Sequence, residues 1–152
     1  MLSRELRLGP PLPEPVLSAF EHEHGIELPE DYRWFLAEIG NGGDGPPPYG
    51  LAPLTDALDE TGAKANVHIG RRYPLTEPWV WEDEPEADPG AVDAAYESGR
   101  IFLGTDGCGL LWVLVVAGPA RGEVWSVSGE GAGPHEPRAG FLGWYAEWLA
   151  EL

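Results

Sequence analysis

The pattern of hydrophobic positions is most distinctive between Leu110 and Ala117, where no polar residue occurs. A strand with one face in water alternates apolar and polar positions, so an unbroken run indicates that both faces are covered. The length of the run, its valines and the flanking glycines favour a strand over a helix. Glycine-containing turns join it to residues 100–104 and 123–128. We therefore expect it to be the central strand of an antiparallel sheet, with its two neighbours adjacent in the sequence.

Helical spacing of apolar residues predicts two helices before this sheet. The first opens at the prolines of residues 12–15 and ends at Gly25, which suits a left-handed C-terminal position. The second opens at residues 28–31 in the same manner and ends at Gly40. Together they form a helical hairpin. Its apolar face consists of Val16, Leu17, Phe20 and His24 from the first helix, and Tyr32, Phe35, Leu36 and Ile39 from the second.

Two more helices are expected later in the chain. Asp88 is placed to cap the first of them, with Pro89 at its first position and Gly99 at its end. A C-terminal helix over residues 141–152 carries an apolar stripe of Phe141, Leu142, Tyr145, Trp148, Leu149 and Leu152. The other segments are predicted as an extended lead-in (1–12), a stiff proline loop (44–50), an edge or irregular strand (51–54), a short helical turn (55–66), an edge strand or coil (73–81) and a Gly/Pro-rich loop (129–140).

Composition narrows the class of protein. The 152 residues fit one domain of the α+β class, a central antiparallel sheet flanked by helices. The single cysteine forms no internal disulfide, which favours the cytoplasm, and no apolar run is long enough for a transmembrane helix. The formal net charge of −17 opposes binding to nucleic acids and to anionic membranes. A basic protein partner, in contrast, would be attracted and steered.

Candidate chemistry is sparse, and we expect no catalytic residue, no metal and no cofactor. Cys108 has Asp106 and glycines as neighbours, so nothing there activates a nucleophile, and a small buried thiol is the better interpretation. His22 and His24 are two residues apart on a helix and do not face each other, unlike zinc ligands at i, i+4. Residues 104–109 lie between strands, which favours a tight turn with glycine at positive φ over a phosphate-binding loop.

The most suggestive surface feature is an acidic run over residues 82–88. One interpretation is a solvated acidic loop, which charge runs usually are. The other is a binding surface for a basic partner, with neighbouring aromatic side chains as anchors or, alternatively, as part of the core. The candidate partner-binding residues are Trp79, Trp81, Glu82, Asp83, Glu84, Glu86 and Asp88.

Several stretches, taken in order, resemble the SUKH superfamily, which groups bacterial immunity proteins with a fungal cell-wall-synthesis regulator. They are Leu-Pro-Glu-Asp-Tyr at 28–32 with Asn-Gly-Gly at 41–43, Tyr-Pro-Leu-Thr at 73–76, Trp-Val-Trp at 79–81, Gly-Thr-Asp-Gly-Cys-Gly at 104–109, Val-Trp at 124–125 and Phe-Leu-Gly-Trp at 141–144. The resemblance implies a SUKH-like domain without catalytic residues. It also implies that Asn41, Gly42, Gly107 and Gly109 are structural turn positions and that Trp112 and Trp125 face the core.

This resemblance implies a protein-binding module. The leading hypothesis is a cytoplasmic immunity protein that masks a cognate bacterial toxin, expected to be a basic protein of the nuclease type. The alternative is an intracellular scaffold or regulator without a toxin, which binds a peptide or a complex through the proline loop or the helical hairpin. A third class, a hydrolase that uses Cys108 or the histidines, would require that Cys108→Ala abolish the biological effect.

Overall fold

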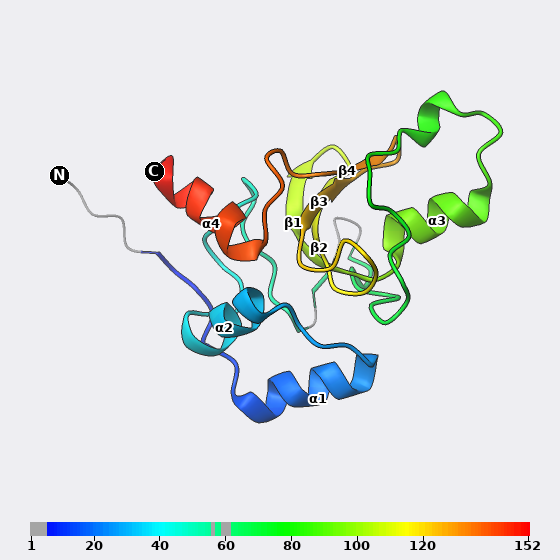
Figure 1. The fold of residues 1–152 in the computed structure, drawn as a ribbon. Coiled ribbons are helices and arrows are strands. Elements are labelled where there is room, and N and C mark those ends of the chain that lie inside the picture. The colour runs from blue at the N-terminus through cyan, green and yellow to red at the C-terminus, as the bar shows by residue number, and fades with distance from the viewer. Residues whose placement is uncertain (1–5, 56, 59–61) are drawn as a thin grey trace.

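The computed structural model describes residues 6–55, 57–58 and 62–152, and its centre is a four-stranded antiparallel sheet (Figure 1). The strands are β1 (Arg100–Gly107), β2 (Leu110–Val115), β3 (Val124–Val127) and β4 (Ala132–Pro134), in the order β1-β2-β3-β4. The sequence prediction of a strand paired with both of its sequence neighbours is confirmed by β2, although this strand ends at Val115 instead of Ala117. The prediction of a continuous loop over residues 129–140 is wrong, because β4 lies within it and pairs with β3.

The four predicted helices are confirmed as α1 (Glu14–His24), α2 (Glu30–Glu38), α3 (Pro89–Glu97) and α4 (Phe141–Ala150), and a short 3-10 helix, η1, covers Trp81–Asp83. Gly25 ends α1 at a φ of 64°, a left-handed conformation that favours glycine. Asp88 caps α3, since its carboxylate accepts a hydrogen bond from the backbone N–H of Ala91 at 3.0 Å. The helical turn expected at 55–66 does not form in the described residues of that segment.

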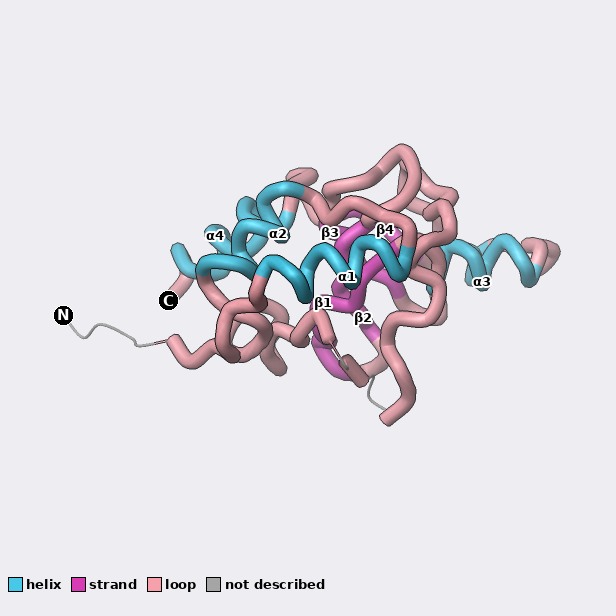
Figure 2. Tube along the Cα trace, turned by 90° about the horizontal axis from the view of Figure 1, so that it is seen from below, coloured by secondary structure: helices cyan, strands magenta, loops and turns pink. Residues whose placement is uncertain are grey.

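Both faces of the sheet are covered, which accounts for the unbroken apolar run of β2. On one face, α1, α2 and α4 pack against the sheet (Figures 1 and 2). The opposite face is covered by loop residues before β1 and by Ala95 of α3. Alternate side chains enter the two clusters: Ile101, Leu103, Leu114 and Val124 on the helical side, and Phe102, Val113, Val115, Trp125 and Val127 on the other.

The tryptophans that were predicted to face the core differ in their burial. Trp125 is fully buried and packs edge-on against Tyr73, with 5.3 Å between ring centroids. Trp112 is half-buried beside Trp144, and its indole N–H donates to the carboxylate of Asp106 at 3.0 Å. The core assignment is therefore confirmed for Trp125, whereas Trp112 lies at the edge of the helical cluster.

The predicted apolar faces are wrong at some of their end positions. Val16 near the start of α1 and Ile39 after α2 are exposed, as are Leu149 and Leu152 at the end of the chain. These positions lie in the first or last turn of a helix or beyond it. Periodicity alone identifies the apolar face of a helix, but it does not show how much of the helix length is covered by the rest of the protein.

The turn between β1 and β2 corrects the interpretation of Cys108. Gly107, Cys108 and Gly109 all have positive φ angles, of 83°, 53° and 81°. The prediction of a tight turn with glycine at positive φ is confirmed. Cys108 itself is exposed and not buried, because this turn extends beyond the cover on both faces of the sheet.

Asp31 connects two helices of the helical layer. Its carboxylate accepts a hydrogen bond from the backbone N–H of Leu142, in the first turn of α4, at 3.0 Å. The same carboxylate accepts from the N–H of Tyr32 at 2.8 Å. The residue before α4 is Gly140, whose lack of a side chain leaves the cap to Asp31. An acidic side chain at the start of α2 therefore caps a helix more than 100 residues away.

We expect Asp31→Ala to lower the free energy of unfolding by about 0.5–2 kcal/mol, the usual effect of removing a helix cap. Asp31→Asn retains an acceptor oxygen and should lose less. Urea unfolding followed by circular dichroism would measure both variants. Equal loss in Asp31→Asn and Asp31→Ala would contradict a role as a hydrogen-bond acceptor.

Candidate functional site

The acidic segment, defined as residues 82–88, follows a definite path at the edge of the sheet. Trp79 forms an antiparallel bridge with Ala132 of β4, with both N–O distances at 2.9 Å. The N–H of Glu82 then donates to the carbonyl of Glu130 at 3.0 Å, and a turn closed by Ala87 N and Glu84 O leads to Asp88. The expected edge strand or coil at 73–81 therefore attaches the acidic segment to β4, and α3 projects away beyond it (Figure 1).

The two neighbouring tryptophans have different environments. Trp81 is only 7% exposed, and its indole N–H donates to the carbonyl of Gly129 at 2.7 Å. Trp79 is half-buried, lies edge-on to Trp81 at 5.5 Å and donates its indole N–H to the carboxylate of Glu84. The core interpretation of the pair thus applies to Trp81, while Trp79 retains an accessible side next to the acidic carboxylates.

The carboxylates of the acidic segment are exposed and form no ion pair with any other described residue; they are Glu82, Asp83, Glu84, Glu86 and Asp88. Arg138, on the chain that follows β4, pairs instead with Glu77 at 3.1 Å and Glu123 at 3.3 Å. Exposed Glu130 adds another negative charge where its carbonyl meets the segment. The surface therefore carries negative charge that no ion pair with a described residue neutralises.

Arg100 holds the other end of α3, and sequence reasoning did not identify it. This side chain is 3% exposed. Its guanidinium donates to the carbonyl of Tyr96 at 3.1 Å and to that of Ala65 at 2.9 Å, and lies 6.0 Å from the centre of the Tyr96 ring. Burial lowers the pKa of Arg100. The sequence offered one signal for this role, a basic residue just after a predicted helix end. Cationic side chains at that position bind the last carbonyls of the helix favourably.

The described residues contain no group of three or more histidine, cysteine, aspartate or glutamate side chains arranged to hold a metal ion. The histidines instead lie in separate places. His24 packs on Phe20, His68 lies 3.6 Å from Glu97, and His135 lies 3.4 Å from Glu147. Within the described ranges, no helix is both long and apolar enough to cross a membrane.

The residues that carry the resemblance perform structural roles. Asp31 caps α4, and the side-chain oxygen of Asn41 accepts the N–H of Leu54 at 2.7 Å. Gly42 has a φ of 76°, and a Cβ there would lie 2.8 Å from the backbone nitrogen of Pro53. Leu28 and Tyr32 are buried in the helical cluster. These positions fix the helical layer and its turns, and none of them lies in the acidic segment.

Comparison with known proteins supports the resemblance. A family model described as the SMI1 / KNR4 family (SUKH-1) matches residues 11–144, which include α1, α2, α3, the whole sheet and the first turn of α4. No curated protein and no solved structure matches the chain significantly. The family contains immunity proteins and a fungal regulator, its members interact with proteins, and it is generally non-catalytic. On the match over most of its length, the chain belongs to the SMI1 / KNR4 family (SUKH-1).

Proposed function

We propose that this protein is a non-enzymatic immunity protein of the bacterial cytoplasm, which binds a cognate toxin and masks its active surface. The whole chain, residues 1–152, acts as one SUKH-like domain in this proposal. The toxin is a basic protein of the nuclease type, because nucleases carry positive charge where they contact phosphates. Neither nucleic acid nor membrane is a partner. The residues that form or support the partner-binding surface are Trp79, Trp81, Glu82, Asp83, Glu84, Glu86 and Asp88.

One observation carries the choice of surface: five exposed carboxylates form no ion pair with a described residue on a segment anchored at both ends. Backbone hydrogen bonds to residues 130 and 132 hold its start, and the Asp88 cap of α3 holds its end. Such anchoring reduces the entropy lost on binding. Attraction between opposite charges then accelerates encounter with a basic surface.

The two tryptophans have different roles in this interface. Trp79 offers an accessible face and is the contact residue, since aromatic side chains are enriched among residues that dominate binding energy. Trp81 packs against Trp79 and donates its N–H to Gly129, so it supports the position of Trp79 from within the core. Asp88 contributes a negative charge to the surface and also caps α3.

Co-expression tests the proposal directly. The open reading frame next to this gene is expressed alone and together with the protein, and cell survival is measured. We expect the neighbour to kill cells only when the protein is absent, and the two purified proteins to form a complex. A matched control is the protein with Asp31→Ala, which alters the helical layer and leaves the acidic segment intact, and should still protect. A harmless neighbour, or killing that the protein does not prevent, would contradict the immunity function.

A scaffold or regulatory role without a toxin is the second candidate, and Tyr49 favours it. This side chain is 75% exposed at the end of the proline loop, of which Pro46 and Pro47 are buried. A large aromatic ring held on a stiff loop is a suitable contact for another protein. Tyr49→Ala should abolish partner binding in this case, whereas in the immunity proposal it should leave protection unchanged.

A further inference from the structure

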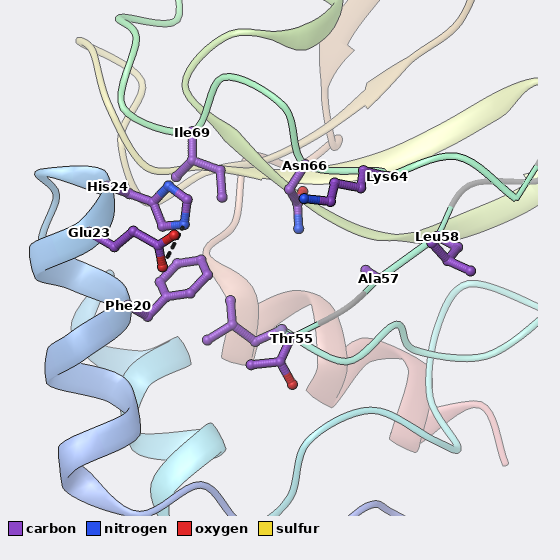
Figure 3. A pocket seen from close by; sticks show the side chains of 10 residues that line it. Phe20, Glu23, His24, Thr55, Ala57, Leu58, Lys64, Asn66 and Ile69 are labelled. Carbon is purple, nitrogen blue, oxygen red and sulfur yellow. Dashed lines mark ion pairs between the residues drawn. The ribbon is translucent and has the colours of Figure 1, made fainter.

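A cavity of about 300 Å³ lies between the C-terminal half of α1 and the chain that leads toward β1. Phe20, Glu23 and His24 form its α1 wall (Figure 3). Lys64 and Asn66 lie on the opposite wall (Figure 3), and Leu54 and Ile69 add apolar surface to the lining. Its size is at the lower end of the range for small-molecule sites.

The apolar part of the cavity is well ordered by packing. Leu54 and Ile69 are buried members of the helical cluster. The rings of Phe20 and His24 lie 4.5 Å apart, so the imidazole fixes one side of the phenyl ring. An apolar group of modest size would therefore meet a preformed surface, which lowers the entropic cost of binding.

The polar part of the opposite wall consists of hydrogen-bond donors. The side-chain oxygen of Asn66 accepts the backbone N–H of Phe102 at 2.7 Å, which fixes the orientation of the amide and leaves its NH₂ group as the donor. Lys64 is the only lysine in a chain with 26 acidic residues. Its ammonium forms no ion pair with a described carboxylate, and both side chains line the same cavity.

We propose that this cavity binds a carboxylate group attached to a small apolar body. The carboxylate accepts hydrogen bonds from the Lys64 ammonium and the Asn66 NH₂, and the apolar body lies on Phe20, Leu54 and Ile69. Charge-assisted hydrogen bonds of this kind are roughly twice as strong as neutral ones. The same chemistry occurs in a free organic acid and in the C-terminal residue of a peptide.

Glu23 also lines the cavity, away from the proposed position of the ligand carboxylate. Its carboxylate is 3.9 Å from Nε2 of His24, and 75% of its side chain is exposed. Its charge is therefore largely screened by solvent. It also belongs to the wall opposite Lys64 (Figure 3). The anionic end of the ligand is thus directed toward Lys64 and Asn66, and the apolar end toward α1.

Three probes of equal shape test the sign of the charge: 3-phenylpropionate, 3-phenylpropanamide and 3-phenylpropylamine. Each is titrated into the intact protein and followed by ¹H–¹⁵N chemical shifts. We expect the acid to bind with a Kd on the order of 1 mM and at least 10-fold more tightly than the amide, with shifts centred on Phe20 and Ile69. Equal binding of acid and amide, or tighter binding of the amine, would overturn the proposal.

Variants locate the carboxylate. Lys64→Met retains the aliphatic stem without the charge, and Asn66→Asp retains the acceptor for Phe102 while replacing the NH₂ donor with a negative charge. Each should weaken the acid at least 5-fold and leave the amide unchanged, whereas Arg72→Met, at an exposed site outside the cavity, should change neither. Unchanged acid binding in both cavity variants would refute the assignment.

The source of the carboxylate is distinguished with the tripeptide Ala-Ala-Phe, prepared with a free and with an amidated C-terminus. Tighter binding of the free-terminus peptide than of 3-phenylpropionate identifies a peptide terminus as the ligand. Tighter binding of 3-phenylpropionate identifies a small organic acid. Both results require that the Lys64→Met variant lose the preference for the carboxylate, and retention of that preference would count against the site.

Discussion

Arg100→Ala is expected to lower the free energy of unfolding by about 2–5 kcal/mol, the cost of leaving two buried carbonyls without partners. The guanidinium joins the last turn of α3, through Tyr96, to the loop at Ala65 and to the start of β1. Its removal therefore separates three segments at one point. Urea unfolding should show a lower midpoint with an unchanged slope, because the surface exposed on unfolding stays the same.

The Arg100 variant also has a local signature. Amide hydrogen exchange should accelerate most in α3 and around residue 65, since these segments lose their common partner. The matched control is Arg72→Ala, at an exposed position, where the change should stay within about 0.5 kcal/mol. Uniform acceleration of exchange across the sheet, or equal loss in both variants, would show that Arg100 does not anchor α3.

If the proposed function holds, neutralising four carboxylates of the acidic segment together should slow association with the proposed toxin partner about 10- to 100-fold at low ionic strength. The variant carries Glu82→Gln, Asp83→Asn, Glu84→Gln and Glu86→Gln, which changes the formal charge from −17 to −13. The dissociation rate should change little, because exposed charges act mainly on encounter. Stopped-flow association at several salt concentrations would measure the effect, and its dependence on salt should become shallower.

The control for this experiment removes the same charge elsewhere. Glu27, Glu38, Glu136 and Glu151 are exposed, and their carboxylates form no ion pair with a described residue. Changing all four to glutamine also gives a net charge of −13 and leaves the acidic segment intact. Slowing of equal size in both variants would mean that total charge steers association, and wild-type association of the first variant would exclude the acidic segment.

The central sheet was predictable because its physical signal is strong and local. An apolar run bounded by glycines has few stable arrangements other than a strand covered on both faces. The helix ends could also be predicted, because Gly25 ends α1 through its own backbone conformation and Asp88 caps α3 through a residue three positions away. Strand β4 could not be predicted, because three residues that include glycine and proline show no periodicity. Only their pairing with β3 makes them a strand.

The candidate site could be predicted only in part. The exposure of the carboxylates in the acidic segment could be predicted from the sequence, because charged residues are almost never buried without a partner. The unequal burial of Trp79 and Trp81 could not be predicted, because it depends on the contact of Trp81 with Gly129, 48 residues further along the chain. Arg100 was missed for a similar reason: its partner at Ala65 lies 35 residues away in a segment without regular structure.

The attachment of the acidic segment has a consequence for how such proteins can diversify. Its start is fixed by main-chain atoms, at Trp79 with Ala132 and at Glu82 with Glu130, and its end by the side-chain cap of Asp88. Main-chain bonds are indifferent to side-chain identity, so substitutions at the exposed positions between Glu82 and Asp88 leave the sheet and helices undisturbed. Under the proposed function, relatives with unrelated partners exchange this stretch wholesale, as antibodies exchange their hypervariable loops, while inheriting the same scaffold beneath it.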